Sequence, residues 1–466
     1  MDKYKKLISN TMIFAIGTFS SKVLVFLLMP LYTRVLDNTA YGVVDLILQT
    51  GNLLIPIVSV GIINSIVRFG LDKNISKKDV FSTGLLTILA GFAVLILFRP
   101  LLAKIPSISD YVILVYLFVL MACLRSLCSQ FTRARGLVRL FAFDGVLSTI
   151  TTIMFTVIFL VPLKWGITGY VMAIFCADFL SVIFLFISAR LYQFVHIRGI
   201  DASVRIAMFK YCIPLIPTSI FWWIMNVSDR YIVTNQLGVE TNGLLAASYK
   251  VPTVVNLISS IFMDAWQISA VSEQTTLERE RFFTRVFRTY QSLLFTVASG
   301  LILFSKVITS VLVSKAFYGS WQFIPFLIMA TTFSCMVNFM GSVYMAEKKS
   351  IFAFVTTAGG AVINVTLNIL LIPIFGVNGA TFATFLGFFI VFVLRAIDTR
   401  RFIKIRFNVF KLLFNTTILG VQSYIMIAEI KYWLWYEIGL TLLMVVTNLG
   451  ALFITMQKLI TKYKRH

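Results

Sequence analysis

Long apolar runs recur along the chain, and they constrain its fold more than any other feature. Runs of roughly 20 apolar residues alternate with short polar breaks, and about 20 such residues form a helix that spans a bilayer. Hydrophobic residues make up 59% of the 466 residues and charged residues only 13%, far beyond what a soluble core needs. We therefore predict an all-α integral membrane protein with about 14 transmembrane helices, which start near residues 8, 42, 80, 111, 142, 167, 211, 243, 289, 321, 351, 377, 408 and 434.

Two stretches need an explicit interpretation. The apolar run from Leu7 to Thr33 follows basic residues, as in a signal peptide, but it is too long for a signal core and has no small-residue cleavage site. We interpret it as the first retained span. The stretch from Ser350 to Leu394 carries no charge and is long enough for two spans, with a predicted turn at Pro373 to Gly379.

The distribution of basic residues predicts the orientation. With both termini in the cytoplasm, the inner segments hold 30 of the 41 Lys and Arg residues and the outer loops hold six. This asymmetry is typical of cytoplasmic loops. It assigns most of the net charge of +22 to topology and to contacts with anionic membrane lipids, and none to nucleic acid. We expect a multi-pass protein of the bacterial plasma (inner) membrane.

Three pairs of segments indicate an internal repeat. "LDNTAYG" at Leu36 and "LGVETNG" at Leu237 are offset by 201 residues, "FAF" recurs at an offset of 211, and the glycines of "GITG" and "GVNG" differ by 210. Six spans per repeat predict two parallel lobes around a central cavity, as in transporters. The predicted divisions are an N-terminal lobe (1–195), a cytoplasmic interfacial linker (196–210), a C-terminal lobe (211–402), and two C-terminal helices with a basic tail (403–466).

Cations inside the predicted spans suggest an anion site. A cation at the centre of a membrane helix costs about 2.5–3.5 kcal/mol, yet Lys22 lies at the middle of the first span and Lys250 within the eighth. A water-filled cavity explains both better than lipid contact does. The candidate substrate-binding set also includes Arg34, Arg230 and Gln49. The repeat offset of 201 places Gln49 opposite Lys250. Phosphate is the ligand that ammonium and guanidinium groups favour.

Acidic residues inside the spans are candidate charge partners or coupling-ion sites. These residues are Asp45, Asp178, Asp229 and Asp264, and the ion would be a proton or sodium. For Arg125, both snorkelling to the headgroups and a role inside the protein remain open. Asp144, near the inner mouth of the fifth span, is interpreted as either a solvated acid or a helix-start acid.

The residues that support enzymatic chemistry are scarce. The chain has two histidines and five cysteines without metal-ligand spacing, and its longest predicted outer loops have about a dozen residues. We predict no catalytic site, no metal site and no cofactor.

Three motifs carry a family resemblance. "SSKVLVFLLMPLYTRVLDNTAYG", "SDRYIVTNQLG" and "NGLLAASYKVP" resemble the polysaccharide-repeat flippases, of O-antigen and capsule type, in the multidrug/oligosaccharidyl-lipid/polysaccharide exporter superfamily. The resemblance covers at least the first twelve spans. It implies a carrier that moves an undecaprenyl-pyrophosphate-linked oligosaccharide from the inner to the outer leaflet by alternating access.

The resemblance extends in part to the lipid II flippases. That branch has two basic residues twelve apart in span 1, which Lys22 and Arg34 match, and one early in span 8, which Lys250 matches. It also has an Arg–Asp pair where this chain has Leu28–Met29. This difference argues against lipid II and for a capsule, exopolysaccharide or O-antigen-like unit. The last two helices of that branch help to form a groove for the lipid tail.

Two alternatives stay open at this point. A cation-coupled multidrug antiporter of the same superfamily would share the fold, although basic residues in the cavity would repel cationic drugs. A membrane polysaccharide polymerase would need a larger extramembrane segment for catalysis. The sugar composition of the cargo, the energy source and the oligomeric state do not follow from the sequence.

Overall fold

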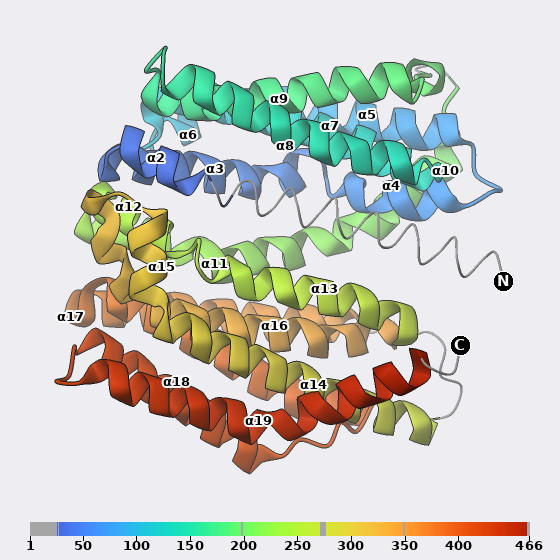
Figure 1. Cartoon of the computed structure of the whole chain (residues 1–466). Helices are drawn as coiled ribbons and strands as arrows, with labels where there is room; N and C mark the ends of the chain where they lie inside the picture. The colour runs from blue at the N-terminus through green and yellow to red at the C-terminus, as the bar shows by residue number, and fades with distance from the viewer. Residues whose placement is uncertain (1–25, 27, 197–198, 271–275, 348–349, 464–466) are drawn as a thin grey trace. The chain divides into compact units, whose positions relative to one another are not determined.

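Every regular element in the part of the chain that the structure describes is a helix (Figure 1). The structure, a computed structural model, describes residues 26, 28–196, 199–270, 276–347 and 350–463. The chain forms two compact units, Met1–Trp223 and Ile224–His466. The boundary falls within one helix, α11 (Ile216–Leu237).

The first unit consists of helices joined by short connections. Asp37 begins one of them, because its side chain accepts a hydrogen bond from Ala40 N at 2.7 Å. Its helices are α2 (Met29–Val35), α3 (Asn38–Val58), α4 (Ile62–Leu71), α5 (Lys77–Leu97), α6 (Arg99–Leu102), α7 (Val112–Ala134), α8 (Val138–Leu160), α9 (Gly166–Ser188), α10 (Ala202–Cys212) and the start of α11, with 3-10 turns at Ser109–Tyr111, Leu191–Phe194 and Ile213–Leu215.

The second unit repeats this style of construction. Its helices are the end of α11, α12 (Val239–Ser248), α13 (Thr253–Ala270), α14 (Thr276–Leu303), α15 (Ser305–Leu312), α16 (Ile324–Ala346), α17 (Ser350–Asp398), α18 (Val409–Ile427) and α19 (Trp433–Tyr463), with 3-10 helices at Lys315–Phe323 and Thr399–Arg401.

The helices confirm a multi-pass membrane protein but do not establish fourteen spans. Among the described residues, ten helices are long and apolar enough to cross a bilayer, and α12 with α13 adds an eleventh if this pair, bent by 43°, is one span. The first predicted span lies almost wholly outside the described residues. The apolar helix α4, only 10 residues long, was not predicted as a separate element.

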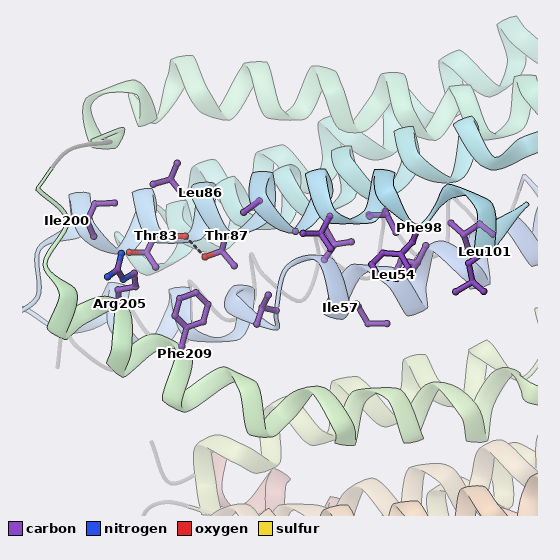
Figure 2. Close-up of a pocket in the computed structure, with 17 residues that line it drawn as sticks. Leu54, Ile57, Thr83, Leu86, Thr87, Phe98, Leu101, Ile200, Arg205 and Phe209 are labelled. Carbon is purple, nitrogen blue, oxygen red and sulfur yellow. Dashed lines mark hydrogen bonds between the residues drawn. The ribbon is translucent and has the colours of Figure 1, made fainter.

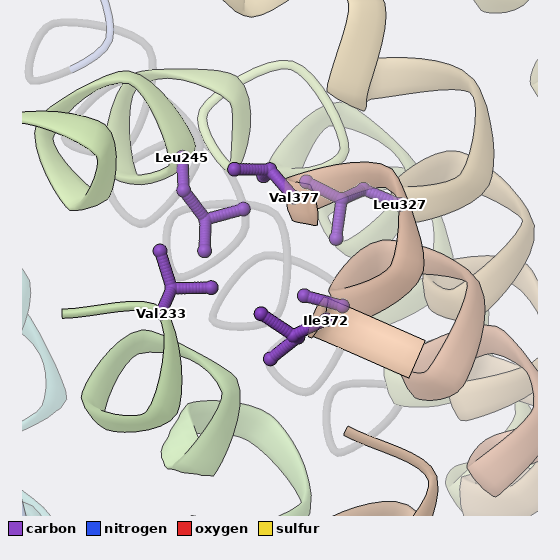
Figure 3. Packing of buried hydrophobic residues seen from close by; sticks show 6 residues of the cluster. Val233, Leu245, Leu327, Ile372 and Val377 are labelled. Atoms are coloured by element: carbon purple, nitrogen blue, oxygen red, sulfur yellow. The ribbon is translucent and has the colours of Figure 1, made fainter. Parts of the chain in front are cut away.

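The predicted turn between two spans is confirmed inside α17. This helix has 49 residues, about 75 Å at 1.5 Å per residue, more than twice the hydrocarbon thickness. Gly376 interrupts it with φ 59° and ψ −141°, a conformation that glycine adopts at little cost. Ile372 and Val377, on the two sides of this break, pack with Val233, Leu245 and Leu327 in one buried cluster (Figure 3).

One helix is central in each unit. α7 packs against α3, α4, α5, α8 and α9, and α16 packs against α13, α14, α17 and α18. The apolar window of α16 is 78% buried, the largest share of any candidate span in the described residues. α7 and α16 correspond to the fourth and tenth predicted spans, which occupy the same position in the two predicted repeats.

The structure buries one basic residue that the sequence assigned to a cytoplasmic segment. Arg395 of α17, counted among the 30 basic residues of the inner segments, is 2% exposed. Its cytoplasmic side stays a prediction. Its guanidinium donates to Val337 O at 2.9 Å, to Ala353 O at 3.1 Å and to the hydroxyls of Thr356 and Thr357 at 3.1 and 2.8 Å. These four bonds satisfy the buried cation. The bond to Val337 ties α17 to α16, and the other three join the two halves of α17.

Candidate functional site

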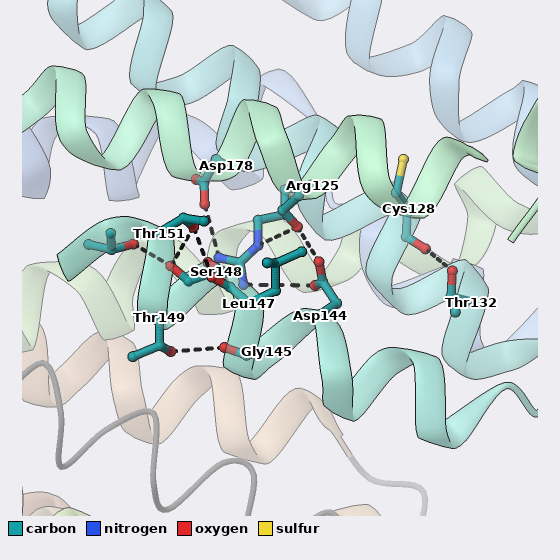
Figure 4. Close-up of polar contacts among 12 residues, drawn as sticks. Arg125, Cys128, Thr132, Asp144, Gly145, Leu147, Ser148, Thr149, Thr151 and Asp178 are labelled. Atoms are coloured by element: carbon teal, nitrogen blue, oxygen red, sulfur yellow. Dashed lines mark hydrogen bonds and ion pairs between the residues drawn. The ribbon is translucent and has the colours of Figure 1, made fainter. Parts of the chain in front are cut away.

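An ion cluster lies inside the first unit, where α7, α8 and α9 meet (Figure 4). Arg125 of α7 donates from Nη1 to Asp178 Oδ1 of α9 at 3.0 Å and from Nε to Ser181 Oγ at 3.2 Å. Its Nη2 lies 3.9 Å from Asp144 Oδ2 of α8. Ser181 in turn donates to the other oxygen of Asp144. Three helices therefore converge on one guanidinium.

The cluster holds two carboxylates for one cation. The side chain of Asp144 is 1% exposed and that of Asp178 is 9% exposed, whereas Arg125 keeps 30% exposure. Buried carboxylates are stable only when paired and hydrogen-bonded, which these contacts achieve. The guanidinium is turned toward the acids, so the role of Arg125 inside the protein is favoured over snorkelling. The interpretation of Asp144 as a solvated acid is wrong.

A polar cavity of about 400 Å³ adjoins this cluster. Arg125 and Asp178 line it together with Tyr32, Asn52 and Tyr170. The rings of Tyr32 and Tyr170 lie 4.5 Å apart between centroids, at a tilt of 47°. A cavity with a cation, an acid, amide groups and a pair of tyrosine rings can bind a polar or charged group, because aromatic and hydrogen-bonding groups converge on it.

Two predicted residues, Asp45 and Gln49, lie on α3 about two turns and one turn before the cavity-lining Asn52. Gln49 Nε2 donates to Asp45 Oδ1 at 3.3 Å, and Asn52, which lines the cavity, follows one turn later. Asp45 is buried and Gln49 is half-buried. Trp223 of α11 donates from its indole nitrogen to the carbonyl of Gln49 at 2.9 Å. Asp45 and Gln49 are therefore joined by a hydrogen bond on one face of α3, in the unit that also holds the ion cluster.

Three further predicted residues are not brought to this cluster by the described part of the structure. Arg34 is exposed in the last turn of α2. Lys22 lies outside the described residues. Asp264 belongs to α13, within the segment whose side chains are not described.

Asp229 and Arg230 of α11 both reach one tyrosine in the second unit. Tyr249, at the end of α12, donates its hydroxyl to Asp229 Oδ2. The guanidinium carbon of Arg230 lies 4.2 Å from the centre of the Tyr249 ring, a cation–π distance. Asp229 is 1% exposed and Arg230 is 7% exposed. These adjacent side chains therefore share one partner, the Tyr249 side chain.

Lys250 follows this tyrosine directly and lies at a break between helices. α12 ends at Ser248 and α13 begins at Thr253, with a bend of 43° across the break. Pro252 lacks the N–H that would continue α12. The N-terminus of α13 carries the positive end of its helix dipole, so a lysine here adds positive charge to positive potential. An anion bound at the break would be stabilised by both.

A neutral polar cluster lies near Asp229, between α11 and α17. Ser228 donates to Asn364 Oδ1 at 3.0 Å, Asn368 donates to the same oxygen at 3.2 Å, and Asn364 donates to Thr384 at 3.5 Å. Both asparagines are fully buried. Among the described residues, Asn368 Oδ1 has no hydrogen-bond partner. Amide and hydroxyl oxygens in such a set suit a water molecule or a hard cation.

The sequence carried signals for the Arg125–Asp178 pair and for the asparagine cluster, neither of which it predicted. Arg125 and Asp178 both interrupt apolar helices, but their sequence separation gives no reason to pair them. Asn364 and Asn368 are four residues apart in a stretch without charge, which places both amides on one helix face.

Sequence comparison identifies a family over most of the chain. A family model described as "Polysaccharide biosynthesis protein" matches residues 7–267. No curated protein matches the chain by sequence.

Solved structures share the fold at low identity. An inward-facing multidrug resistance MATE family transporter of the MOP superfamily is 12% identical with a TM-score of 0.67, over 83% of this chain and 98% of that one. The lipid II flippase MurJ, in an inward closed conformation, is 15% identical with a TM-score of 0.64, over 96% and 100% of the two chains. An outward-facing MATE transporter has 12% identity and a TM-score of 0.60, over 84% and 94%.

Proposed function

The chain belongs to the polysaccharide biosynthesis protein family, and from this premise we propose that it flips an undecaprenyl-pyrophosphate-linked oligosaccharide from the inner to the outer leaflet. It would do so by alternating access, and the oligosaccharide would be a repeat unit of a capsule, an exopolysaccharide or a related surface polysaccharide. Its fold is that of membrane transporters and flippases, including one flippase of a lipid-linked sugar precursor. The inner membrane and two cytoplasmic termini remain part of the proposal.

The observation that carries this proposal is the helix break at Lys250. A phosphate group at the break would meet the ammonium of Lys250 and the positive end of the α13 dipole together. Broken helices are a recurring way in which transporters present a helix terminus to an anionic substrate. Lys22 and Arg34 stay candidate cationic contacts on the ground of the sequence alone, and Arg230 would support the break through Tyr249.

The coupling ion in this proposal is a proton or sodium. Asp229 accepts a hydrogen bond from Tyr249, the residue before Lys250, and the oxygen-rich cluster around Asn364 and Asn368 includes Ser228, which precedes Asp229. Asp178 is the corresponding candidate in the first unit, with Asp45 and Asp264 as the remaining acids. Imposed proton and sodium gradients, applied one at a time, would identify the ion from the gradient that accelerates flipping.

The test measures flipping of a short-chain polyprenyl-pyrophosphate oligosaccharide in proteoliposomes. The Lys250→Ala variant should lose tenfold or more of the rate, because one charged hydrogen bond contributes about 1.5–3 kcal/mol. Lys250→Arg should retain most of the rate, since it keeps the charge. Lys315→Ala, in the 3-10 helix Lys315–Phe323, serves as the control outside the break.

The outcomes separate the candidate functions. If the wild type flips the lipid and Lys250→Ala matches it, the lysine is structural and the assigned site is wrong. If the wild type moves no lipid but expels cationic drugs, the multidrug antiporter is the function. One observation favours this second candidate, namely the excess of carboxylates over cations in the Arg125 cluster. No observation favours a polymerase.

A further inference from the structure

A long apolar groove runs along the first unit, apart from the ion cluster (Figure 2). Its volume is about 680 Å³, and α3, α5, α6 and α10 supply its walls. Leu54, Leu86 and Val94 are typical of its lining. Gly91 lets α5 approach α3 closely, because a Cβ at this position would collide with the backbone of Val58. The groove is therefore shaped to hold an apolar chain.

The length of the groove matches one leaflet. Its lining residues on α5 run from Thr83 to Leu95, which is about 18 Å at 1.5 Å per residue. Half of the hydrocarbon core of a bilayer is about 15 Å. A single acyl chain of a phospholipid would lie along this wall in an extended form.

Polar groups gather at one end of the groove. Arg205, an exposed residue of α10, is the one charged residue in the lining, and it lies at the same end as Thr83 (Figure 2). Thr83 is 2% exposed, and within the described part of the chain its hydroxyl has no hydrogen-bond partner. Phe98 and Leu101 mark the opposite end, which is apolar. One end thus offers a positive charge and a buried hydroxyl to the head of a chain.

We propose that this groove binds one anionic phospholipid, with an acyl chain along α5 and its phosphate at Arg205 and the Thr83 hydroxyl. A phosphodiester carries one negative charge, which a single guanidinium matches. The pyrophosphate of a polyprenyl carrier would bring more negative charge than one arginine compensates. The inference is independent of the proposed cargo, since it concerns neither Lys250 nor the polar cavity at Arg125.

The test is native mass spectrometry of the full-length protein released from detergent micelles. The probes are dioleoyl phosphatidylglycerol, dioleoyl phosphatidylcholine and a short polyprenyl monophosphate, each titrated separately. We expect one equivalent of phosphatidylglycerol to bind more tightly than phosphatidylcholine. Arg205→Ala should weaken this binding about tenfold. It should weaken the binding of phosphatidylcholine less, because the choline cation already compensates the phosphate of that lipid.

Two further variants test the location of the chain. Val94→Trp fills the groove along its α5 wall, and Ala90→Phe fills it one turn earlier. The test needs only one of these two variants to fold. Both should abolish the bound equivalent. Lys210→Ala, an exposed cation on the same helix as Arg205 but outside the lining, should leave the affinity unchanged.

Every other outcome overturns the proposal. Binding that survives the filling variants places the lipid elsewhere. Equal binding of the two phospholipids removes the role of Arg205. Tighter binding of the polyprenyl monophosphate through the same residues makes the carrier the occupant. Absence of any bound lipid means that protein fills the groove in the intact chain.

Discussion

Replacing Arg125 should destabilise the protein much more than replacing its partner Asp178. Arg125→Met leaves two buried carboxylates without a cation, and breaking a buried pair in this way costs about 3–5 kcal/mol. Because Arg125 is 30% exposed, we expect the lower end of this range, about 3 kcal/mol. Asp178→Asn keeps an oxygen for the 3.0 Å contact and leaves Asp144 as the counter-ion, so we expect a loss of about 1 kcal/mol.

The assay is unfolding in mixed micelles, with SDS as denaturant and tryptophan fluorescence as the signal. The measured quantity is the difference in the free energy of unfolding between each variant and the wild type. Arg139→Met, an exposed arginine on α8, is the control and should stay within about 0.5 kcal/mol of the wild type. Equal losses for the Arg125 and Asp178 variants, or an Arg125 variant as stable as the control, would refute the reasoning about uncompensated carboxylates.

Two further predictions use the same titration. Gly341→Ala should lower the free energy of unfolding by about 1–3 kcal/mol, because its Cβ would lie 2.9 Å from Nη1 of the hydrogen-bonded Arg395. The control is Gly420→Ala, whose Cβ would meet no atom within 4 Å, and it should be neutral or stabilise by up to about 1 kcal/mol. Equal effects at the two glycines would contradict the crowding argument. Lys306→Met should cost about 1 kcal/mol, because its ammonium lies 4.2 and 4.4 Å from two tryptophan rings and 2.5 Å from a Glu429 oxygen. Glu429→Gln should cost less, and an equal loss would mean that the rings contribute nothing.

The helical membrane fold could be predicted because its cause is local. A run of about 20 apolar residues indicates each span. A proline and two glycines close together indicate the turn at Gly376. The short helix α4 was missed because ten residues do not form a full span, so the length criterion passes over it. Sequence alone also could not place the compact-unit boundary inside α11, where the helix continues without a break in composition.

The ionic contacts could be predicted only in part, because a pair depends on which helices are neighbours. Arg125 and Asp178 are 53 positions apart, and only the packing of α7 against α9 brings them together. Arg395 illustrates the same limit. Its position at the end of a span is typical of a headgroup contact, yet neighbouring carbonyls and hydroxyls make burial stable. Asp229 and Arg230 share Tyr249, which directly follows the last residue of α12, and their sequence positions do not indicate this contact.

The burial of Arg395 against Gly341 has an evolutionary consequence. The guanidinium occupies the space that any side chain at position 341 would need, so the two positions are coupled by volume. A lineage that replaced the arginine by a short apolar residue would leave a void, and a larger residue at 341 would fill it. Substitutions at positions 341 and 395 should therefore occur together in evolution, because either substitution alone gives a less stable protein.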